Sequence, residues 1–246
     1  DVLTHRKPSP SDLLTLNEVL DEFQKTSNIY ILRGNHDSET KADDGVTALS
    51  LFERSDNKNI VKIITHTWHD KENKRVFIPH YENEERIKED LRSVPKGYYM
   101  FGHFGYNGCL NSVGDCDFGI SPDCFNTPSF LGHIHRFVQK GDITILGTPY
   151  TTNFGESEKE NYYALLDDGG PRTKKNTGWI SGDGETHITE LKLVDHGPRH
   201  LLVNYEDLEE KLSYINDDNY FTILKILVNK IESSESISSD IINKLR

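Results

Sequence analysis

The sequence predicts an α/β fold, because short apolar runs typical of buried strands alternate with segments of helical periodicity. Residues 28–33 (NIYILR) form the clearest strand, and they end at Gly34, which suits a tight turn. Of the 246 residues, 35% are hydrophobic and 28% are charged. The apolar residues occur in clusters that can build a core, which excludes a disordered chain.

The first predicted helix lies within residues 1–27 and has a clear start signal. Ser9 is a favourable cap, Pro10 suits the first helical position, and Asp12 is placed to complete a capping box. Leucines and a phenylalanine then recur at helical spacing, at positions 13, 16, 20 and 23. Further helices are expected over 43–54, 82–92 (an exposed helix), 205–214 and 237–246.

The remaining predicted strands are short and separated by turn-forming residues. They are expected over 60–66, 97–102, 128–132, 142–147, 161–167, 186–194 and 220–228. Residues 105–128 are rich in Gly, Asn, Asp and Pro, which predicts a long functional or mobile loop. After a Gly-rich stretch at 168–185 the pattern changes, so we place a domain boundary near residue 186.

The charge and the cysteines narrow the class of protein. With 28 basic and 40 acidic residues the net charge is −12, which excludes a general nucleic-acid coat protein. No run approaches about 18 consecutive apolar residues, so neither a transmembrane helix nor a membrane partner is expected. Cys109, Cys116 and Cys124 form no CxxC pair and indicate a reducing compartment, which we take to be the cytoplasm.

Three predicted strands end in the same way, with an apolar run followed by Gly and a nearby His. The segments are Gly34-Asn35-His36-Asp37, Gly102-His103 and Gly132-His133-Ile134-His135. Because ligands bind at the carboxyl ends of strands in α/β sheets, we expect these side chains along one rim. If the backbone stays extended, His133 and His135 point the same way, and a metal ion is the natural partner of converging imidazoles.

The order of these segments resembles the GNH[DE], GH and GHxH motifs of the calcineurin-like metallophosphoesterases. Within that superfamily the chain is most similar to the SbcD-type DNA repair nuclease subunits, particularly phage-encoded forms. Supporting stretches are Asp1 with Lys7-Pro8-Ser9, Ile78-Pro79 before an acidic helix, and 147–156 (GTPYTTNFGE). The resemblance covers residues 1–167 and implies a four-layer β-sandwich flanked by helices, followed by a small α+β capping domain.

The resemblance implies that five of these residues bind two divalent metal ions. Asp1 would bridge the two ions, and Asn35, His103 and His133 would complete one site. His135 would serve the other site. Oxygen and imidazole donors suit several divalent ions, and the resemblance implies manganese.

The resemblance also implies catalytic roles for two residues beside the metals. His36 would donate a proton to the leaving oxygen or stabilise developing charge, and Asp37 would orient His36. A pair of cations would activate a bridging water and neutralise the phosphate oxygens for in-line attack. No substrate-binding residue is assigned.

The chain departs from the family pattern at its beginning. It opens on Asp1 rather than Met, and no Asp-x-His motif occurs upstream of Asn35. We therefore expect the first βα unit, about 30 residues, to be absent from the nuclease domain at 1–186. The expected result is one complete and one incomplete metal site, which would limit catalysis by this chain. Thr4 stands where the family usually has Asp or His, and the capping domain at 187–246 is also expected to be incomplete.

The implied function is that of a metal-dependent phosphodiesterase, a DNA exonuclease or endonuclease subunit of an SbcCD-type recombination and repair complex. Its partners would be DNA and an SMC-like ATPase of the SbcC type, and a homodimer is compatible with the resemblance. One alternative is a calcineurin-like phosphatase or small-molecule phosphodiesterase, since 31–36 (ILRGNH) is similar to the Ser/Thr phosphatase version. Residues 1–5 (DVLTH) lack that branch's GDxVDRG. The other alternative is a non-catalytic scaffold on the same fold, against which the intact motif histidines count.

The other side chains of interest have no partner at a ligand spacing, so we expect them to pack or to lie at the surface. A basic group in the Gly-rich stretch, Arg172 with Lys174 and Lys175, is expected to be solvated. His66 and His69, which flank Trp68, are expected to pack or to be exposed to solvent, and His80, His187, His196 and His200 are expected at the surface.

Overall fold

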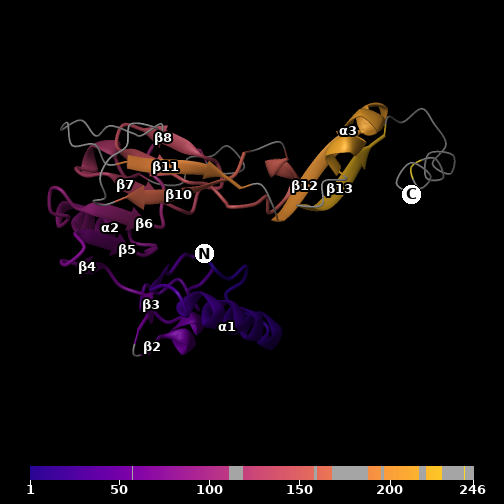
Figure 1. The fold of residues 1–246 in the computed structure, drawn as a ribbon. Coiled ribbons are helices and arrows are strands. Elements are labelled where there is room, and N and C mark those ends of the chain that lie inside the picture. The colour runs from indigo at the N-terminus through magenta and orange to yellow at the C-terminus, as the bar shows by residue number, and fades with distance from the viewer. Residues whose placement is uncertain are drawn as a thin grey trace. The chain divides into compact units, whose positions relative to one another are not determined.

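The structure is a computed structural model, and it describes residues 1–56, 58–110, 119–157, 160–167, 188–194, 197–215, 220–228 and 241. These residues form an α/β fold with mixed sheets and few helices, in agreement with the predicted class (Figure 1). The chain divides into two compact units, Asp1–Gly147 with Leu166–Thr189, and Thr148–Leu165 with Glu190–Arg246. The second unit thus includes a segment that precedes the boundary expected near residue 186.

The larger sheet of the first unit has six strands in the order β4-β5-β6-β7-β9-β8. The bounds of these strands are Trp68–Asp70 (β4), Arg75–Ile78 (β5), Tyr99–Gly102 (β6), Ser129–Leu131 (β7), Val138–Lys140 (β8) and Ile143–Ile145 (β9). Strands β5, β6, β7 and β9 are parallel neighbours, whereas β4 and β8 pair antiparallel at the two edges. The carboxyl ends of the four central strands therefore meet at one edge of the sheet.

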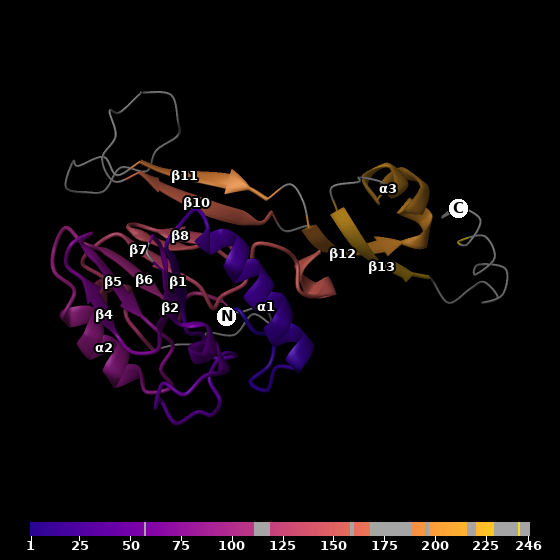
Figure 2. The same ribbon diagram turned by 60° about the horizontal axis from the view of Figure 1, so that its bottom comes forward.

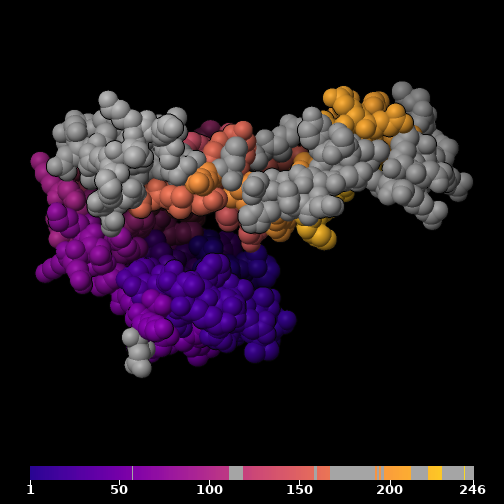
Figure 3. All heavy atoms as spheres, in the orientation of Figure 1, coloured from indigo at the N-terminus to yellow at the C-terminus, as the bar shows by residue number. Residues whose placement is uncertain are grey.

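A second, smaller sheet contains β1 (Ile29–Leu32), β3 (Ile60–Ile64) and β2 (Arg54–Ser55), with β1 and β3 parallel. Helix α1 (Pro10–Gln24) packs beside β1 and β3, as Figure 2 shows. Its N-terminus has the capping box predicted for Ser9 and Asp12. In the space-filling view the side chains of this part of the chain, drawn in indigo and purple, form a closely packed body (Figure 3).

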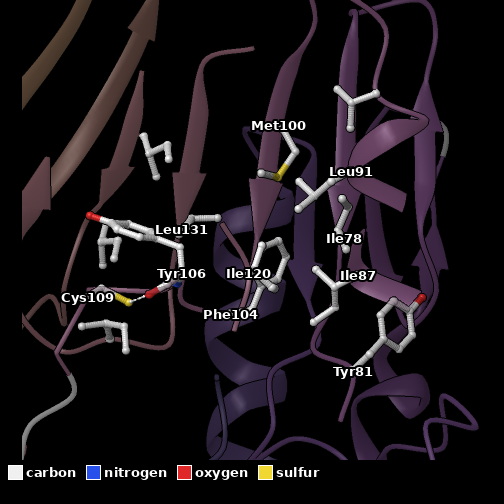
Figure 4. Packing of buried hydrophobic residues seen from close by; sticks show 14 of the residues in the cluster. Ile78, Tyr81, Ile87, Leu91, Met100, Phe104, Tyr106, Cys109, Ile120 and Leu131 are labelled. Carbon is white, nitrogen blue, oxygen red and sulfur yellow. Dashed lines mark hydrogen bonds between the residues drawn. The ribbon is translucent and has the colours of Figure 1, made fainter. Parts of the chain in front are cut away.

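Helix α2 (Glu84–Arg92) covers the six-stranded sheet with one of its faces. Ile87 and Leu91, four residues apart, are buried on this face, and Figure 4 shows them directed toward Met100 and Ile78. Burying each such side chain contributes roughly 1.5–3 kcal/mol. The predicted helix at 82–92 is confirmed, but only its polar face is exposed.

A row of stacked aromatic rings joins the two sheets of the first unit. Tyr30 of β1 lies 5.7 Å from Trp68 and 5.8 Å from Phe77, measured between ring centroids. Phe77 stacks on Phe101 at 5.0 Å, and Phe101 stacks on Phe130 at 5.7 Å. Large aromatic faces of this kind hold sheets together by burial and offset stacking. The row holds β1 against the strands β5, β6 and β7 and so positions the loops that follow these strands.

The remaining strands form two further sheets of two strands each. Strand β10 (Tyr162–Asp167) pairs with β11 (Ile188–Leu193). Strand β12 (Gly197–Asn204) pairs in parallel with β13 (Tyr220–Leu227). The 3-10 helix η4 (Tyr205–Asp207) and helix α3 (Leu208–Ile215) follow β12 in the chain, where a helix at 205–214 was predicted. The helices in the described part of the chain are too short or too polar to cross a lipid bilayer.

The predicted helix over 43–54 is wrong. Asp43 and Gly45 have φ of 55° and 81°, which no right-handed helix accommodates, and only a 3-10 helix, η1 (Ala48–Phe52), forms. Strands β2, β4, β5, β8 and β12 were not predicted. The described parts of the expected loop, 105–110 and 119–128, contain only the 3-10 helix η2 (Pro122–Cys124). The expected irregular stretch at 168–185 lies outside the described residues, as does the helix at 237–246 apart from Ile241.

Candidate functional site

Three neighbouring parallel strands of the six-stranded sheet are each followed by a histidine. His80 follows β5, His103 follows β6 and His133 follows β7. The ladder continues past the strands, because the His103 amide donates to the Ile78 carbonyl at 3.2 Å and the Gly132 amide to the Gly102 carbonyl at 2.9 Å. The three imidazole rings lie with centroids 5.3 to 6.3 Å apart.

The segment Gly34-Asn35-His36-Asp37 approaches these histidines from the other sheet, after β1. The two sheets are connected at this point by a hydrogen bond from the His80 amide to the Arg33 carbonyl, 3.0 Å long. We expected the predicted residues along one rim; the strand ends that carry them belong to two sheets, and this hydrogen bond connects the sheets at that point.

Asp1 lies between the two sheets, where Figure 1 shows the N-terminus. Its Oδ1 accepts a hydrogen bond from the His36 amide at 2.8 Å, and its Oδ2 lies 3.2 Å from Nε2 of His103. A Cβ atom added at Gly34 would come within 2.0 Å of Asp1 Oδ1. Glycine at position 34 is thus required for the close approach of Asp1 to the loop after β1.

Asp37 is buried and joins the N-terminal segment to the loop after β1. Its Oδ1 accepts from the amides of Val2 and Leu3 at 2.9 and 2.8 Å, and its Oδ2 accepts from the Gly34 amide at 2.8 Å. We expected Asp37 to orient His36, but the His36 ring is instead held by a backbone carbonyl group. Nδ1 of His36 lies 2.9 Å from the carbonyl oxygen of Thr4.

The orientation of His36 leaves its second ring nitrogen available. A carbonyl oxygen only accepts hydrogen bonds, so Nδ1 must donate its proton to Thr4. His36 is exposed, and its Nε2 is the nitrogen left to exchange a proton with a bound molecule. Thr4 thus contributes to the site through its backbone carbonyl.

His103 is the most deeply buried of the predicted site residues with an imidazole, with 6% of its surface exposed. Burial lowers the pKa of His103 well below its usual range, and the neighbouring His133 and His80 lower it further. The ring is therefore neutral at neutral pH, which is the form that binds metal ions. Although Nε2 is close to Asp1 Oδ2, the alignment does not make a hydrogen bond, and this buried nitrogen has no hydrogen-bond partner in the described ranges.

His133 has an unusual backbone conformation beside this cluster. Its φ is 78°, in the left-handed region that costs a non-glycine residue of order 1–3 kcal/mol. The chain bends at this point, so the extended backbone that would have aligned His133 with His135 is absent. The bend instead places Nδ1 of His133 3.1 Å from Oδ1 of Asn35. His135 is half-buried in the same bend, and its metal-binding role stays a prediction.

His80 was expected at the surface, and the structure overturns this expectation. Its exposed fraction is 6%, and its ring stacks on His133 at 5.6 Å with an interplanar angle of 27°. The sequence does indicate that His80 follows a strand. Residues 75–80 (RVFIPH) contain an apolar run followed by a histidine, the same pattern as in the three motifs, with Pro79 in place of the glycine.

The other histidines within the described residues do not join the cluster. His66 is exposed, and His69 is half-buried in β4 with its Nε2 3.4 Å from Ser93 Oγ. His200, also expected at the surface, is half-buried in the second unit, where its ring contacts Phe154 edge-to-face at 5.1 Å. The predictions for His187, His196 and the basic group Arg172, Lys174 and Lys175 lie outside the described residues.

The donors suit a divalent ion in chemical type, because imidazole nitrogen and carboxylate oxygen are both ligands of such ions. Nε2 of His103, which is buried and has no hydrogen-bond partner in the described ranges, lies 3.2 Å from Oδ2 of Asp1. Asn35 and His133 supply a second oxygen and nitrogen pair. No three His, Cys, Asp or Glu side chains within the described ranges are arranged to hold an ion together, so binding would require side-chain rotation.

The structure thus places the exposed imidazole of His36 beside a group of oxygen and nitrogen donors. Among the described residues these donors come from Asp1, Asn35 and the histidines after β6 and β7. No protein-family model matches the chain, and no curated protein matches it either.

Proposed function

We propose that this chain is a calcineurin-like metallophosphoesterase, and specifically the nuclease subunit of an SbcCD-type DNA recombination and repair complex. The observation that carries the proposal is the convergence of Asp1, Asn35, His103 and His133. Asn35, His103 and His133 lie in the three motifs, in their order along the chain, and Asp1 comes from a fourth segment. In this proposal the two sheets of the first unit belong to a four-layer β-sandwich, and the second unit belongs to a capping domain.

Asp1, Asn35, His103 and His133 would hold one divalent ion and His135 would contribute to a second, with manganese the ion that the resemblance implies. When bound, two such ions supply an activated water and neutralise the charge on the phosphate oxygens. The chain's own residues prepare the site for this. Burial keeps His103 neutral and able to donate its nitrogen lone pair.

His36 would act on the leaving group of the phosphodiester. Its Nδ1 donates to the Thr4 carbonyl at 2.9 Å, which orients the ring. In the imidazolium form, the exposed Nε2–H can give its proton to the departing oxygen, which leaves a neutral ring still bonded to Thr4 through Nδ1. Asp37 would support this step indirectly. By accepting from the amides of Val2, Leu3 and Gly34, its carboxylate fixes the Thr4 segment against the loop that carries His36.

The substrate in this proposal is a DNA end, and the partner is an SMC-like ATPase of the SbcC type. A net charge of −12 disfavours extended tracking of the phosphate backbone, so contact with DNA would be confined to the metal site. The reaction would take place in the cytoplasm, or in the host cytoplasm for a phage-encoded protein. A homodimer fits the proposal as well.

The test is manganese-dependent hydrolysis of duplex DNA ends by the intact protein. We expect His36→Ala to lower the rate by about 10²- to 10⁴-fold, the usual contribution of a general acid. His66→Ala serves as the matched control, because His66 is exposed and lies outside the cluster. Undiminished hydrolysis by His36→Ala would refute the proposed step, and turnover of a phosphoprotein but not of DNA would favour a phosphatase.

A further inference from the structure

His80 lies beside the proposed metal-binding residues although it belongs to none of the three motifs. It follows Pro79 at the carboxyl end of β5, next to the strand that carries His103. Its side chain is 8% exposed, and its ring centroid is 5.6 Å from that of His133 and 6.3 Å from that of His103. The His80 ring thus lies next to the imidazoles of both His103 and His133.

The hydrogen bonding of His80 determines its tautomer. Nδ1 lies 3.2 Å from the carbonyl oxygen of His103, and because that oxygen only accepts, Nδ1 must carry the proton. The bond ties the His80 ring to the peptide that carries the His103 side chain. The other nitrogen, Nε2, faces the Glu82 carboxylate at 3.8 Å, away from hydrogen-bond distance.

Arg33, which follows β1 of the smaller sheet, holds His80 in place. The carbonyl oxygen of Arg33 accepts from the His80 amide at 3.0 Å, and Nη2 of the Arg33 side chain donates to the His80 carbonyl at 2.5 Å. Its Nη1 donates to Oγ of Ser38 at 2.7 Å, on the loop that carries Asn35 and His36. Arg33 is only 1% exposed, so this guanidinium is a rigid internal link between the two loops.

From these contacts we infer that His80 is a positioning residue for the metal site, one that fixes the His103 peptide by its Nδ1 proton and supports the His133 ring by stacking. The inference rests on the proposed function, because it concerns the same site. His80 does not itself touch substrate or metal in this role. It determines how well the neighbouring donors keep their arrangement, in the way that groups behind metal ligands commonly do.

Two substitutions separate the two contacts of His80. His80→Asn keeps an N–H donor close to the position of Nδ1 but removes the ring, whereas His80→Phe keeps a ring against His133 but removes the donor. We expect each to weaken the binding of Mn²⁺ about 10- to 100-fold, as measured by calorimetry on the intact protein. His69→Asn and His69→Phe are the matched controls, and they should bind Mn²⁺ like the wild type.

Reference variants make the outcomes distinguishable. If the wild type binds Mn²⁺ and His103→Ala does not, while both His80 variants bind like the wild type, the inference is overturned and the proposed function stands. If the wild type binds no Mn²⁺, the proposed function fails and the inference fails with it. Urea unfolding without metal checks that a weakened variant is still folded.

The tautomer of His80 can be measured directly on the wild-type protein. Long-range ¹H–¹⁵N correlation of the histidine rings reports which nitrogen carries the proton. The inference requires His80 to be protonated at Nδ1 when neutral, and a ring protonated at Nε2 alone would overturn it. This readout holds even if both His80 substitutions prevent folding.

Discussion

Asp37→Asn is the substitution that tests most directly how the site is assembled. The carboxylate of Asp37 is buried and accepts three backbone amides, those of Val2 and Leu3 on Oδ1 and that of Gly34 on Oδ2. Asparagine has nearly the same shape but only one acceptor oxygen. Its oxygen can keep the two bonds to Val2 and Leu3, and its NH₂ group then meets the N–H of Gly34, which leaves two donors facing each other.

The magnitude follows from the bond that is lost. A hydrogen bond to a charged acceptor contributes about 1.5–3 kcal/mol, and a buried N–H left without an acceptor costs about 1–3 kcal/mol. The two figures describe overlapping parts of one change, so they do not add fully. Loss of the negative charge also weakens the two bonds that remain. We expect the free energy of unfolding to fall by about 2–4 kcal/mol.

Urea unfolding of the metal-free protein at pH 7 measures this difference. Asp12→Asn is the matched control, because Asp12 also accepts two bonds at 2.8 Å, from the amide and Oγ of Ser9, but does so in water. That substitution should cost no more than about 1 kcal/mol. The reasoning would be refuted if Asp37→Asn cost as little as the control, since the carboxylate would then not be holding the loop.

Three further predictions concern packing and pH. Gly34→Ala places a methyl group where Asp1 Oδ1 lies, within 2.0 Å, so we expect a loss of about 1–3 kcal/mol in urea unfolding; an unchanged midpoint would mean that Asp1 does not occupy this space. The pKa of His103 is lower in the folded state than its unfolded value near 6.5, so below pH 6.5 the ring gains a proton on unfolding. The contribution of the neutral ring to stability is therefore complete above pH 6.5 and is lost as the pH falls toward the folded pKa. Metal-free unfolding at pH 7 and pH 5.5 should therefore show a decrease of at most about 1.4 kcal/mol per pH unit from this group, and His103→Gln should reduce that slope. Leu91→Ala removes a side chain that is 2% exposed and should lower the free energy of unfolding by about 2–5 kcal/mol. Leu14→Ala, at a position 66% exposed, should change it by less than about 0.5 kcal/mol, and equal losses in the two variants would contradict the packing of α2.

The strands that carry the motifs could be predicted because each is a continuous apolar run that ends at a glycine. Such runs are typical of strands buried on both faces, and β6 and β7 are largely of this kind, whereas in β1 only Ile31 is fully buried. Strands β4 and β8 lie at the edges of their sheet, where residues are only partly buried and the sequence is mixed. These strands are defined by their hydrogen bonds to neighbouring strands, and their own short sequences contain no apolar pattern that predicts a strand.

The helix expected over 43–54 failed for a local reason that outweighed its apolar spacing. Gly45 turns the chain with a positive φ, and Thr47 then caps only the short 3-10 helix that follows. The loop instead uses Asp43 to accept from the amides of Glu82 and Asn83, at 2.8 and 3.0 Å. Those contacts span about forty positions of sequence, so a reading of helical periodicity does not detect them.

By itself, the sequence determined the α/β class, the strand ends that carry the motif histidines and the residue types placed there, because apolar periodicity and glycine preferences are local properties. Only the tertiary structure decided that these strand ends belong to two connected sheets and that His80 joins His103 and His133. It also decided that His133 bends into the left-handed region and that Asp37 holds Val2 and Leu3 rather than His36. These features depend on contacts between segments that are distant in the chain, and the free energy of such contacts exceeds the local preferences of any one residue.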